Sequence, residues 1–126
     1  NNFEEYLSNN GIKIVKIFLH VSKEEQKERL MERIERPEKN WKFASSDITE
    51  RKYFDDYMKA YEDMLINTST KAAPWYIVPA DRKWFSRYFV SEVILEKLKE
   101  MDPKYPELSK EELESLDKWK KILEEN

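Results

Sequence analysis

The stretch IKIVKIFLHV, residues 12–21, decides the fold class of this chain. It is rich in β-branched residues and becomes almost continuously apolar at its end, which is typical of a strand buried on both faces of a parallel sheet. A second apolar run, WYIV at residues 75–78, is closed by Pro79. Two such strands separated by long helical segments indicate parallel pairing. The sequence therefore predicts an α/β fold.

Helical patterns with their own start and stop signals fill most of the remaining chain. Asn10 and Gly11 should end a short helix that begins near Phe3. Capping-box patterns predict helix starts at residues 22–25, 47–50 and 109–112, and Pro37 should stop the first of these helices. We expect a loop over residues 38–46, a helix over residues 48–67, and a helix over residues 82–101 capped by Asp81.

Apolar residues at helical spacing predict which faces are buried. For the helix over residues 82–101 they are Phe85, Phe89, Val93, Leu95 and Leu98. For the last helix the predicted inner face consists of Leu113, Leu116, Trp119, Ile122 and Leu123. An aromatic cluster in the middle of the chain is also interpreted as core, and its members are Tyr53, Phe54, Tyr57 and Tyr61.

The two strands raise the question of what completes the sheet. A two-stranded parallel sheet is not a stable unit by itself. The chain also lacks an initiator methionine and opens in what resembles the middle of an element. We therefore interpret it as a piece of a longer protein, in which the other strands come from further chain or from another subunit.

Composition excludes several classes of protein. The 126 residues carry a net charge of −3, are 39% charged with both signs mixed, and contain no cysteine. Disulfides and cysteine nucleophiles are therefore excluded, and no stretch approaches the ~20 apolar residues of a membrane span. We expect a cytoplasmic protein without membrane or nucleic-acid partners. The single glycine, Gly11, excludes a glycine-rich phosphate loop within this chain.

The segment from Arg29 to Asp56 combines a basic helix, a proline stop, a short basic and aromatic loop, and a second helix. Arg29, Arg33 and Arg36 have i, i+4, i+7 spacing, and Lys39, Trp41 and Lys42 continue the strip. Such a segment could be a lid that closes over an anion. The alternative is an exposed helix with ordinary ion pairs, since Glu25 and Glu32 stand four residues before Arg29 and Arg36.

Other polar residues could contribute to a site, although each also has a structural explanation. His20 ends the first strand, where ligands of open α/β sheets bind. Asp55 and Asp56 are adjacent, so they point about 100° apart on a helix and do not form an obvious catalytic pair. Lys83 belongs to a basic group that is equally ordinary as a helix face.

Two longer stretches resemble the type 2 polyphosphate kinase family. They are FLHVSKEEQKERLMERIERPEKNWKF at residues 18–43 and APWYIVPADRKW at residues 73–84. The resemblance extends over about residues 3–106, with residues 107–126 forming an acidic C-terminal helix. It implies the C-terminal half of a P-loop kinase-like three-layer fold, with a lid at about residues 29–56. The family's phosphate loop lies in the N-terminal half, which is absent here.

The resemblance also implies a function. Members move phosphoryl groups between inorganic polyphosphate and nucleoside mono- or diphosphates with Mg²⁺, for which we identify no ligands in this chain. The implied catalytic cations are Arg33, Arg29, Lys39 and Lys42, and the implied substrate-binding residues are Arg36, Trp41, Asp56 and Lys83. We expect a homo-oligomer, and we expect this chain to be inactive without the N-terminal half.

Two other interpretations stay open. The chain could be the lid half of a nucleoside monophosphate kinase, which would use ATP instead of polyphosphate as the donor. It could also be a non-catalytic helical module whose basic strip docks onto an acidic partner.

Overall fold

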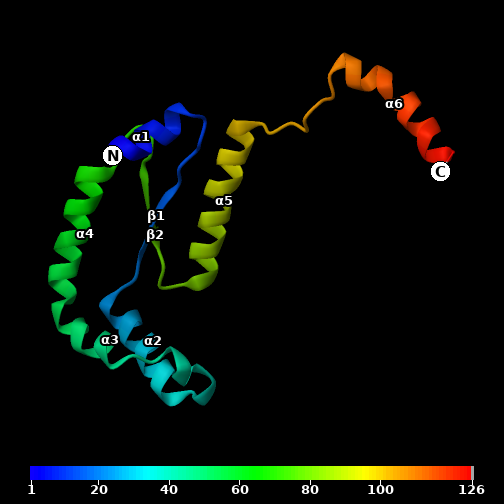
Figure 1. Cartoon of the computed structure of the whole chain (residues 1–126). Coiled ribbons are helices and arrows are strands. Elements are labelled where there is room, and N and C mark those ends of the chain that lie inside the picture. Colours follow the sequence, from blue (N-terminus) through cyan, green and yellow to red (C-terminus); the bar gives the residue numbers. More distant parts are fainter. Residues whose placement is uncertain (126) are drawn as a thin grey trace.

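The computed structural model describes residues 1–125 and confirms the predicted order of elements (Figure 1). Helices dominate, and the two strands lie between α4 and α5. The elements are α1 (Asn2–Asn9), β1 (Lys16–His20), α2 (Lys23–Glu35), the 3₁₀ helix η1 (Pro37–Lys42), α3 (Ser45–Glu50), the 3₁₀ helix η2 (Arg51–Tyr53), α4 (Phe54–Thr68), β2 (Trp75–Pro79), α5 (Lys83–Met101) and α6 (Lys110–Glu124).

The two strands pair in parallel, as the sequence predicts. The register runs from Lys16 opposite Trp75 to His20 opposite Pro79. The Ala80 N–H then donates to the His20 carbonyl at 2.8 Å, which prolongs the ladder by one bond. Both strands therefore end at the same edge of the sheet, beside the start of α2. This edge is where an open α/β sheet presents ligands.

The prediction of a long first strand buried on both faces is wrong for this chain. The strand covers residues 16–20 instead of 12–21, and its only buried residue is Lys16. Leu19 and Ile77 are 53% and 57% exposed, whereas Val78 is fully buried. The reason is that, within residues 1–125, each strand pairs only with the other, so much of the sheet stays uncovered.

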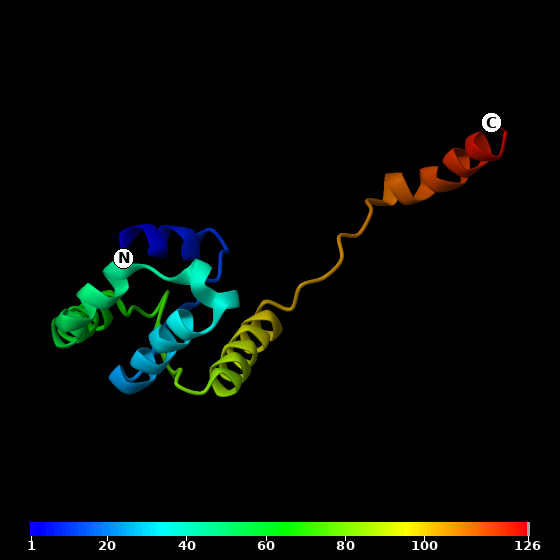
Figure 2. The same cartoon turned by 90° about the horizontal axis from the view of Figure 1, so that it is seen from below.

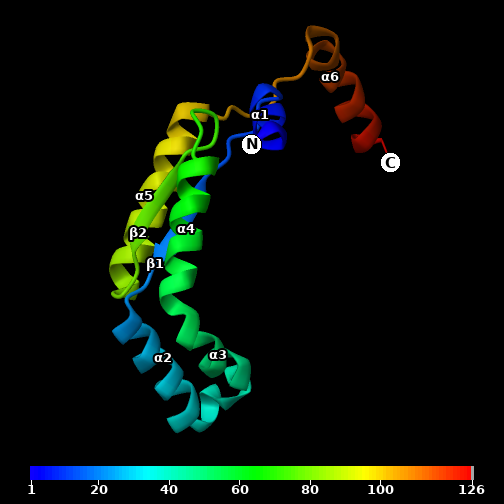
Figure 3. The ribbon, with the colours of Figure 1, turned by 90° about the vertical axis from the view of Figure 1, so that its left-hand side faces the viewer.

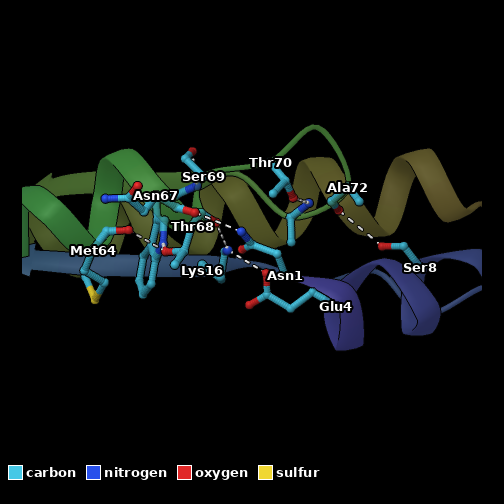
Figure 4. A network of polar contacts seen from close by, with 12 residues as sticks. Asn1, Glu4, Ser8, Lys16, Met64, Asn67, Thr68, Ser69, Thr70 and Ala72 are labelled. Atoms are coloured by element: carbon cyan, nitrogen blue, oxygen red, sulfur yellow. Dashed lines mark hydrogen bonds and ion pairs between the residues drawn. The ribbon is translucent and has the colours of Figure 1, made fainter.

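A polar network around Lys16 holds the opposite end of the sheet together (Figure 4). The Lys16 ammonium donates to the Glu4 carboxylate at 2.7 Å and to the Thr68 carbonyl. The Trp75 indole donates to the Thr68 hydroxyl at 2.8 Å, and the Lys16 ammonium lies 5.3 Å from the Trp75 ring centre. The network thereby joins α1, β1, the end of α4 and the start of β2. Pairing and local hydrogen bonds make this lysine tolerable in a buried position.

The segment after Pro37 is more ordered than predicted. The expected loop over residues 38–46 contains η1 and the start of α3, and the expected helix over residues 48–67 is divided into α3, η2 and α4. Asp47 does not cap a helix. It lies in the first turn of α3, whose N-cap is Ala44, and its carboxylate pairs with Arg33. Figure 3 shows that α2 and α3 together form one end of the molecule.

The predicted inner faces of the last two helices are only partly buried. In α5, Val93 is buried, whereas Leu95 and Leu98 are exposed. The α6 helix begins with the complete Ser109 and Glu112 capping box, as predicted. However, α6 lies apart from the rest of the chain, so its apolar face is not buried (Figures 1 and 2). No helix within residues 1–125 is both long and apolar enough to cross a membrane.

Candidate functional site

A cleft of about 530 Å³ opens between α2, α3, η2 and α4. Its walls mix cations, acids and aromatic rings, which suits a polar ligand that is positioned by a few charged groups. The lining residues that come from α2 include Arg29 and Arg33, and those from the segment opposite include Asp47, Arg51, Tyr57 and Tyr61. Most of the cleft therefore lies within the predicted lid segment, residues 29–56, and the rest is formed by residues just before it and by Tyr57 and Tyr61.

Arg29 joins this predicted lid segment to the sheet. Its Nε donates to the Glu25 carboxylate at 2.7 Å, which is one of the i, i+4 pairs anticipated by the salt-bridge interpretation. Its Nη2 donates to the Ala80 carbonyl at 2.6 Å and to the Asp81 carbonyl at 3.1 Å. The guanidinium thus ties α2 to the residues directly after β2, and it also lines the cleft.

Asp81 strengthens the same junction, and its predicted role as a helix cap is wrong. The N-cap of α5 is Arg82, and no side chain caps that helix. The Asp81 carboxylate instead accepts a 2.8 Å hydrogen bond from the Ser22 backbone N–H. This hydrogen bond lowers the pKa of Asp81, with smaller contributions from the Ser22 hydroxyl, Arg29 and His20.

The same contact explains why the capping box at Ser22 is only half formed. The Ser22 hydroxyl accepts from the Glu25 N–H at 3.1 Å, as predicted. The Ser22 N–H, however, bonds to Asp81, and the Glu25 carboxylate bonds to Arg29. Tertiary partners have therefore replaced the second bond of the box.

Arg33 connects α2 to α3 at the cleft. Its Nη1 donates to the Asp47 carboxylate at 3.0 Å, so α2 is bridged to α3 across 14 residues of sequence. Both side chains line the cleft and are partly exposed. A cation held at a cleft wall by a partly exposed carboxylate can exchange that partner for another anion, because such exposed pairs are weak.

The other predicted cations do not line this cleft. Arg36 pairs with Glu32 at 2.8 Å and with Glu38 at 2.7 Å, and Lys39 also bonds to Glu32. The hydrogen bond from Lys39, followed by that from Arg36, lowers the pKa of Glu32. This exposed network matches the ion-pair interpretation, although it extends into η1, beyond the simple i, i+4 pattern.

The loop residues Trp41 and Lys42 do not line the cleft. Trp41 is 79% exposed, and the Lys42 ammonium lies 4.8 Å from its ring centre. The structure therefore places this pair on the surface of η1, outside the cleft lining.

Asp56, Lys83 and His20 are also outside the cleft. Asp56 is exposed and lies 3.9 Å from the Lys59 ammonium, and Lys83 is exposed in the first turn of α5. His20 lines a smaller cavity of about 330 Å³ together with Asp81 and Trp84. Within residues 1–125, no group of three His, Cys, Asp or Glu side chains is arranged to hold a metal ion.

Several cleft residues were not predicted. Arg51 Nη1 donates to the Lys23 carbonyl at 2.8 Å and to the Gln26 side chain at 2.7 Å. The Tyr57 hydroxyl donates to the Glu50 carboxylate at 2.8 Å, which raises the pKa of Tyr57. Residues 47 and 51, and residues 50, 54, 57 and 61, have helical spacing, so this shared face was visible in the sequence.

The interpretation of the aromatic cluster of residues 53–61 as core is only partly correct. Tyr61 packs on Phe18 of β1 with a ring-centre distance of 5.0 Å, which is a core-like contact between α4 and the sheet. Tyr53, Tyr57 and Tyr61 nevertheless remain partly exposed, and Phe54, Tyr57 and Tyr61 line the cleft. The aromatic face of α4 therefore packs on β1 and also forms a wall of the cleft.

Comparison with known proteins assigns this arrangement to a family. The model of the family described as "Polyphosphate kinase 2 (PPK2)" matches residues 1–106. The chain belongs to the polyphosphate kinase 2 family. The matched residues include the cleft, the sheet and the junction formed by Arg29 and Asp81.

A named relative agrees with this assignment, and a second, uncharacterized protein is similar over nearly the whole chain. The "ADP-polyphosphate phosphotransferase" of Rhodopseudomonas palustris is 53% identical over 106 residues, which cover 84% of this chain and 37% of that protein. An uncharacterized protein from Leptolyngbya boryana is 53% identical over 124 residues, covering 98% of this chain and 91% of the relative.

A solved structure extends the likeness to the fold. The crystal structure of Polyphosphate Kinase 2 from Arthrobacter aurescens TC1 matches with a TM-score of 0.88 and 38% identity. The match covers all of this chain and 44% of that one. The chain thus spans less than half the length of the Rhodopseudomonas phosphotransferase and of the Arthrobacter kinase.

The junction at Asp81 gives a testable pH dependence. Because the pKa of Asp81 is lowered in the folded chain, its carboxylate stabilises the fold above the usual aspartate pKa of about 3.9, and this contribution is lost as the pH falls through the lowered value. Asp81→Asn should therefore reduce the free energy of unfolding at pH 7, and its difference from wild type should shrink below about pH 4. Urea unfolding followed by tryptophan fluorescence measures this difference.

The matched control is Asp117→Asn, which removes a carboxylate from α6, away from this junction. It should leave the pH dependence near that of the wild type. A difference between Asp81→Asn and wild type that stays constant from pH 7 to well below pH 4 would contradict the role given to the Ser22 contact.

Proposed function

We propose that this chain supplies the lid half of a phosphotransferase that moves phosphoryl groups between inorganic polyphosphate and nucleoside mono- or diphosphates. The observation that carries the proposal is the cleft, where Arg29, Arg33 and Arg51 come together within a segment that matches the polyphosphate kinase 2 family. The name of the Rhodopseudomonas relative supports polyphosphate and ADP as the reacting pair.

The chemistry of phosphoryl transfer explains why cations at a lid are useful. Charge accumulates on the oxygens of the transferred group, and there is little covalent work for the protein to do. Fixed cations near those oxygens lower the barrier, and a closed lid excludes water. Arg33 is the best placed of the predicted cations, since it lines the cleft and its partner Asp47 is partly exposed. A phosphate oxygen would take the place of the Asp47 carboxylate.

Arg29 has a different role in this proposal. Its guanidinium already donates to the Glu25 carboxylate and to the carbonyls of Ala80 and Asp81. Replacing those partners with substrate would release α2 from the sheet. We therefore assign Arg29 to positioning α2, while Arg33 contacts the phosphate.

Lys39 and Lys42 could join the site only through a movement of η1, because they do not line the cleft in this structure. The same holds for Arg36 and Trp41. Their proposed part in binding polyphosphate therefore depends on lid closure. Lys83 lies beyond the predicted lid, in the first turn of α5. It would bind substrate at the edge of the sheet.

The phosphate loop has to come from another segment. A chain with one glycine cannot form a glycine-rich loop, and the Arthrobacter structure has more than half of its length outside the match. That remainder would also cover the exposed faces of β1 and β2. The Mg²⁺ ion implied by the family resemblance would be held by groups other than a carboxylate cluster in residues 1–125.

The first test is complementation. The chain alone, given polyphosphate and ADP, should produce no ATP above background. A chimera that joins the N-terminal remainder of the Rhodopseudomonas relative to this chain should produce ATP, because it restores the phosphate loop beside the lid. A luciferase assay measures both. Turnover by the chain alone, or a folded but inactive chimera, would contradict the proposal.

The second test addresses Arg33 in the same chimera. Arg33→Ala should lower kcat by about 10²-fold or more, because it removes a cation that stabilises the transition state, and it should change the unfolding free energy by less than about 1 kcal/mol. The matched control is Lys97→Ala, which removes another partly exposed ion pair, that with Glu100 on α5. A near-normal kcat combined with a loss of stability would favour the purely structural salt-bridge interpretation.

A further inference from the structure

Arg51 lines the cleft from η2, and its hydrogen-bond partners are neutral. Its Nη1 donates to the backbone carbonyl of Lys23 at 2.8 Å and to the side-chain oxygen of Gln26 at 2.7 Å. Within residues 1–125 it forms no ion pair with a carboxylate, and its Nε and Nη2 donate to no other residue. Arg51 therefore brings an unpaired positive charge to the cleft, with N–H donors available to a ligand.

The other two arginines of the cleft have carboxylate partners. Arg29 pairs with Glu25 at 2.7 Å, and Arg33 pairs with Asp47 at 3.0 Å. A carboxylate beside a guanidinium cancels most of the attraction that a second anion would feel, because the two opposite charges act from nearly the same place. The attraction of the cleft for an anion therefore comes mainly from Arg51.

The acids of the cleft leave Arg51 accessible to an anion. The carboxylate of Glu50 accepts from the Tyr57 hydroxyl at 2.8 Å, and adjacent helical residues such as Glu50 and Arg51 point about 100° apart. Asp47 precedes Arg51 by four residues, so the two side chains lie on the same side of their segment. An anion that takes the place of Asp47 at Arg33 would therefore meet Arg51 about one helical turn away.

The partners of Arg51 also hold it in place. Lys23 and Gln26 belong to the first turn of α2. The Lys23 ammonium lies 3.5 Å from the Asp55 carboxylate and 5.3 Å from the ring centre of Phe54, so the same turn contacts the start of α4. A guanidinium fixed in this way loses little side-chain freedom when an anion binds, which favours affinity.

We propose, on the basis of the function proposed above, that Arg51 anchors the phosphate chain by binding a phosphate that is not transferred, next to the phosphate that meets Arg33. Arg51 gives up no partner to do so, whereas Arg33 has to exchange Asp47. An interaction that is equally strong in the ground state and in the transition state lowers KM without raising kcat. Arg51 therefore determines substrate affinity, and Arg33 contributes to the rate.

The chemistry that Arg51 recognises is a phosphoanhydride chain, which occurs in polyphosphate and in ADP. Calorimetric titration of the chain with inorganic tripolyphosphate, and separately with ADP, tests the role. Arg51→Gln keeps an amide that can hydrogen-bond to α2 but removes the charge. It should weaken binding of at least one probe by about ten-fold or more, because a hydrogen bond between charged groups is lost. The probe that depends more strongly on Arg51 identifies the source of the phosphate chain.

The matched control is Lys52→Gln. Lys52 is the next residue of η2, is exposed, and does not line the cleft. This variant removes an equal charge from the same short helix, and it should change either affinity by less than about two-fold, because the charge is screened by solvent and salt. Arg51→Lys restores the charge without the planar fork, so it should recover only part of the affinity that Arg51→Gln loses.

Kinetics of the chimera separate anchoring from a structural role. Arg51→Gln should raise KM about ten-fold while kcat stays within about three-fold of the unmodified chimera, because ground-state and transition-state binding fall together. A purely structural role would lower kcat instead, since a displaced lid misplaces the reacting groups.

A third measurement needs no variant. The Arg51 Nε–H signal of the wild-type chain should shift saturably when the bound probe is added, with the same midpoint as the Arg33 signals. The signal of Arg87, which lies on α5, should shift much less.

Several results would overturn the role given to Arg51. They are the absence of saturable binding of both probes by the wild-type chain, an unshifted Arg51 signal, equal losses of affinity in Arg51→Gln and Lys52→Gln, and a fall in kcat with unchanged KM. An inactive chimera contradicts the proposed function instead. The binding measurements on the chain alone then still decide whether Arg51 holds a phosphate chain.

Discussion

The hydrogen bonds between the start of α2 and the end of β2 are the constraint on which the rest of this structure depends. Asp81 accepts from the Ser22 N–H, and Arg29 donates to the two carbonyls that follow the strand. These bonds cross more than 50 residues of sequence and fix the angle at which the lid segment leaves the sheet. The Lys16 network closes the other end of the same two strands. The cleft can keep its shape because both ends of its scaffold are held.

The same arginines satisfy two interpretations that seemed to exclude one another. The ion pairs Glu25 with Arg29 and Glu32 with Arg36 exist, as an ordinary salt-bridged helix requires. Arg29 also holds the sheet, and Arg33 bridges to Asp47 across the cleft. Because weak, partly exposed pairs are readily exchanged, a salt-bridged face can act as a lid surface when a stronger anion arrives. On this interpretation, the salt-bridged arrangement of the arginines is the resting state of the proposed lid.

Local signals made much of the fold predictable. Gly11, Pro37 and the Ser109 capping box mark element boundaries by backbone chemistry that acts over a few residues. The role of Asp81 was not predictable, since its partner Ser22 lies 59 residues away and competes with a local cap. The predicted burial of Leu19, Leu95 and Leu98 was wrong for a different reason. Apolar patterns indicate that a surface contacts another apolar surface, but residues 1–125 do not supply that second surface. Arg51 was missed although its spacing from Asp47 shows the shared face.

The central claim is that the cleft receives a phosphate chain through Arg33 in place of Asp47. Arginine side-chain NMR of the chain, titrated with inorganic tripolyphosphate, tests it most directly. We expect saturable shifts of the Arg33 guanidinium signals that exceed those of Arg36 and of Arg87, an arginine on α5. The Asp47→Asn variant should bind more tightly, because the competing carboxylate is gone. Shifts confined to Arg36 and its exposed network, or no saturable shift at Arg33, would contradict it.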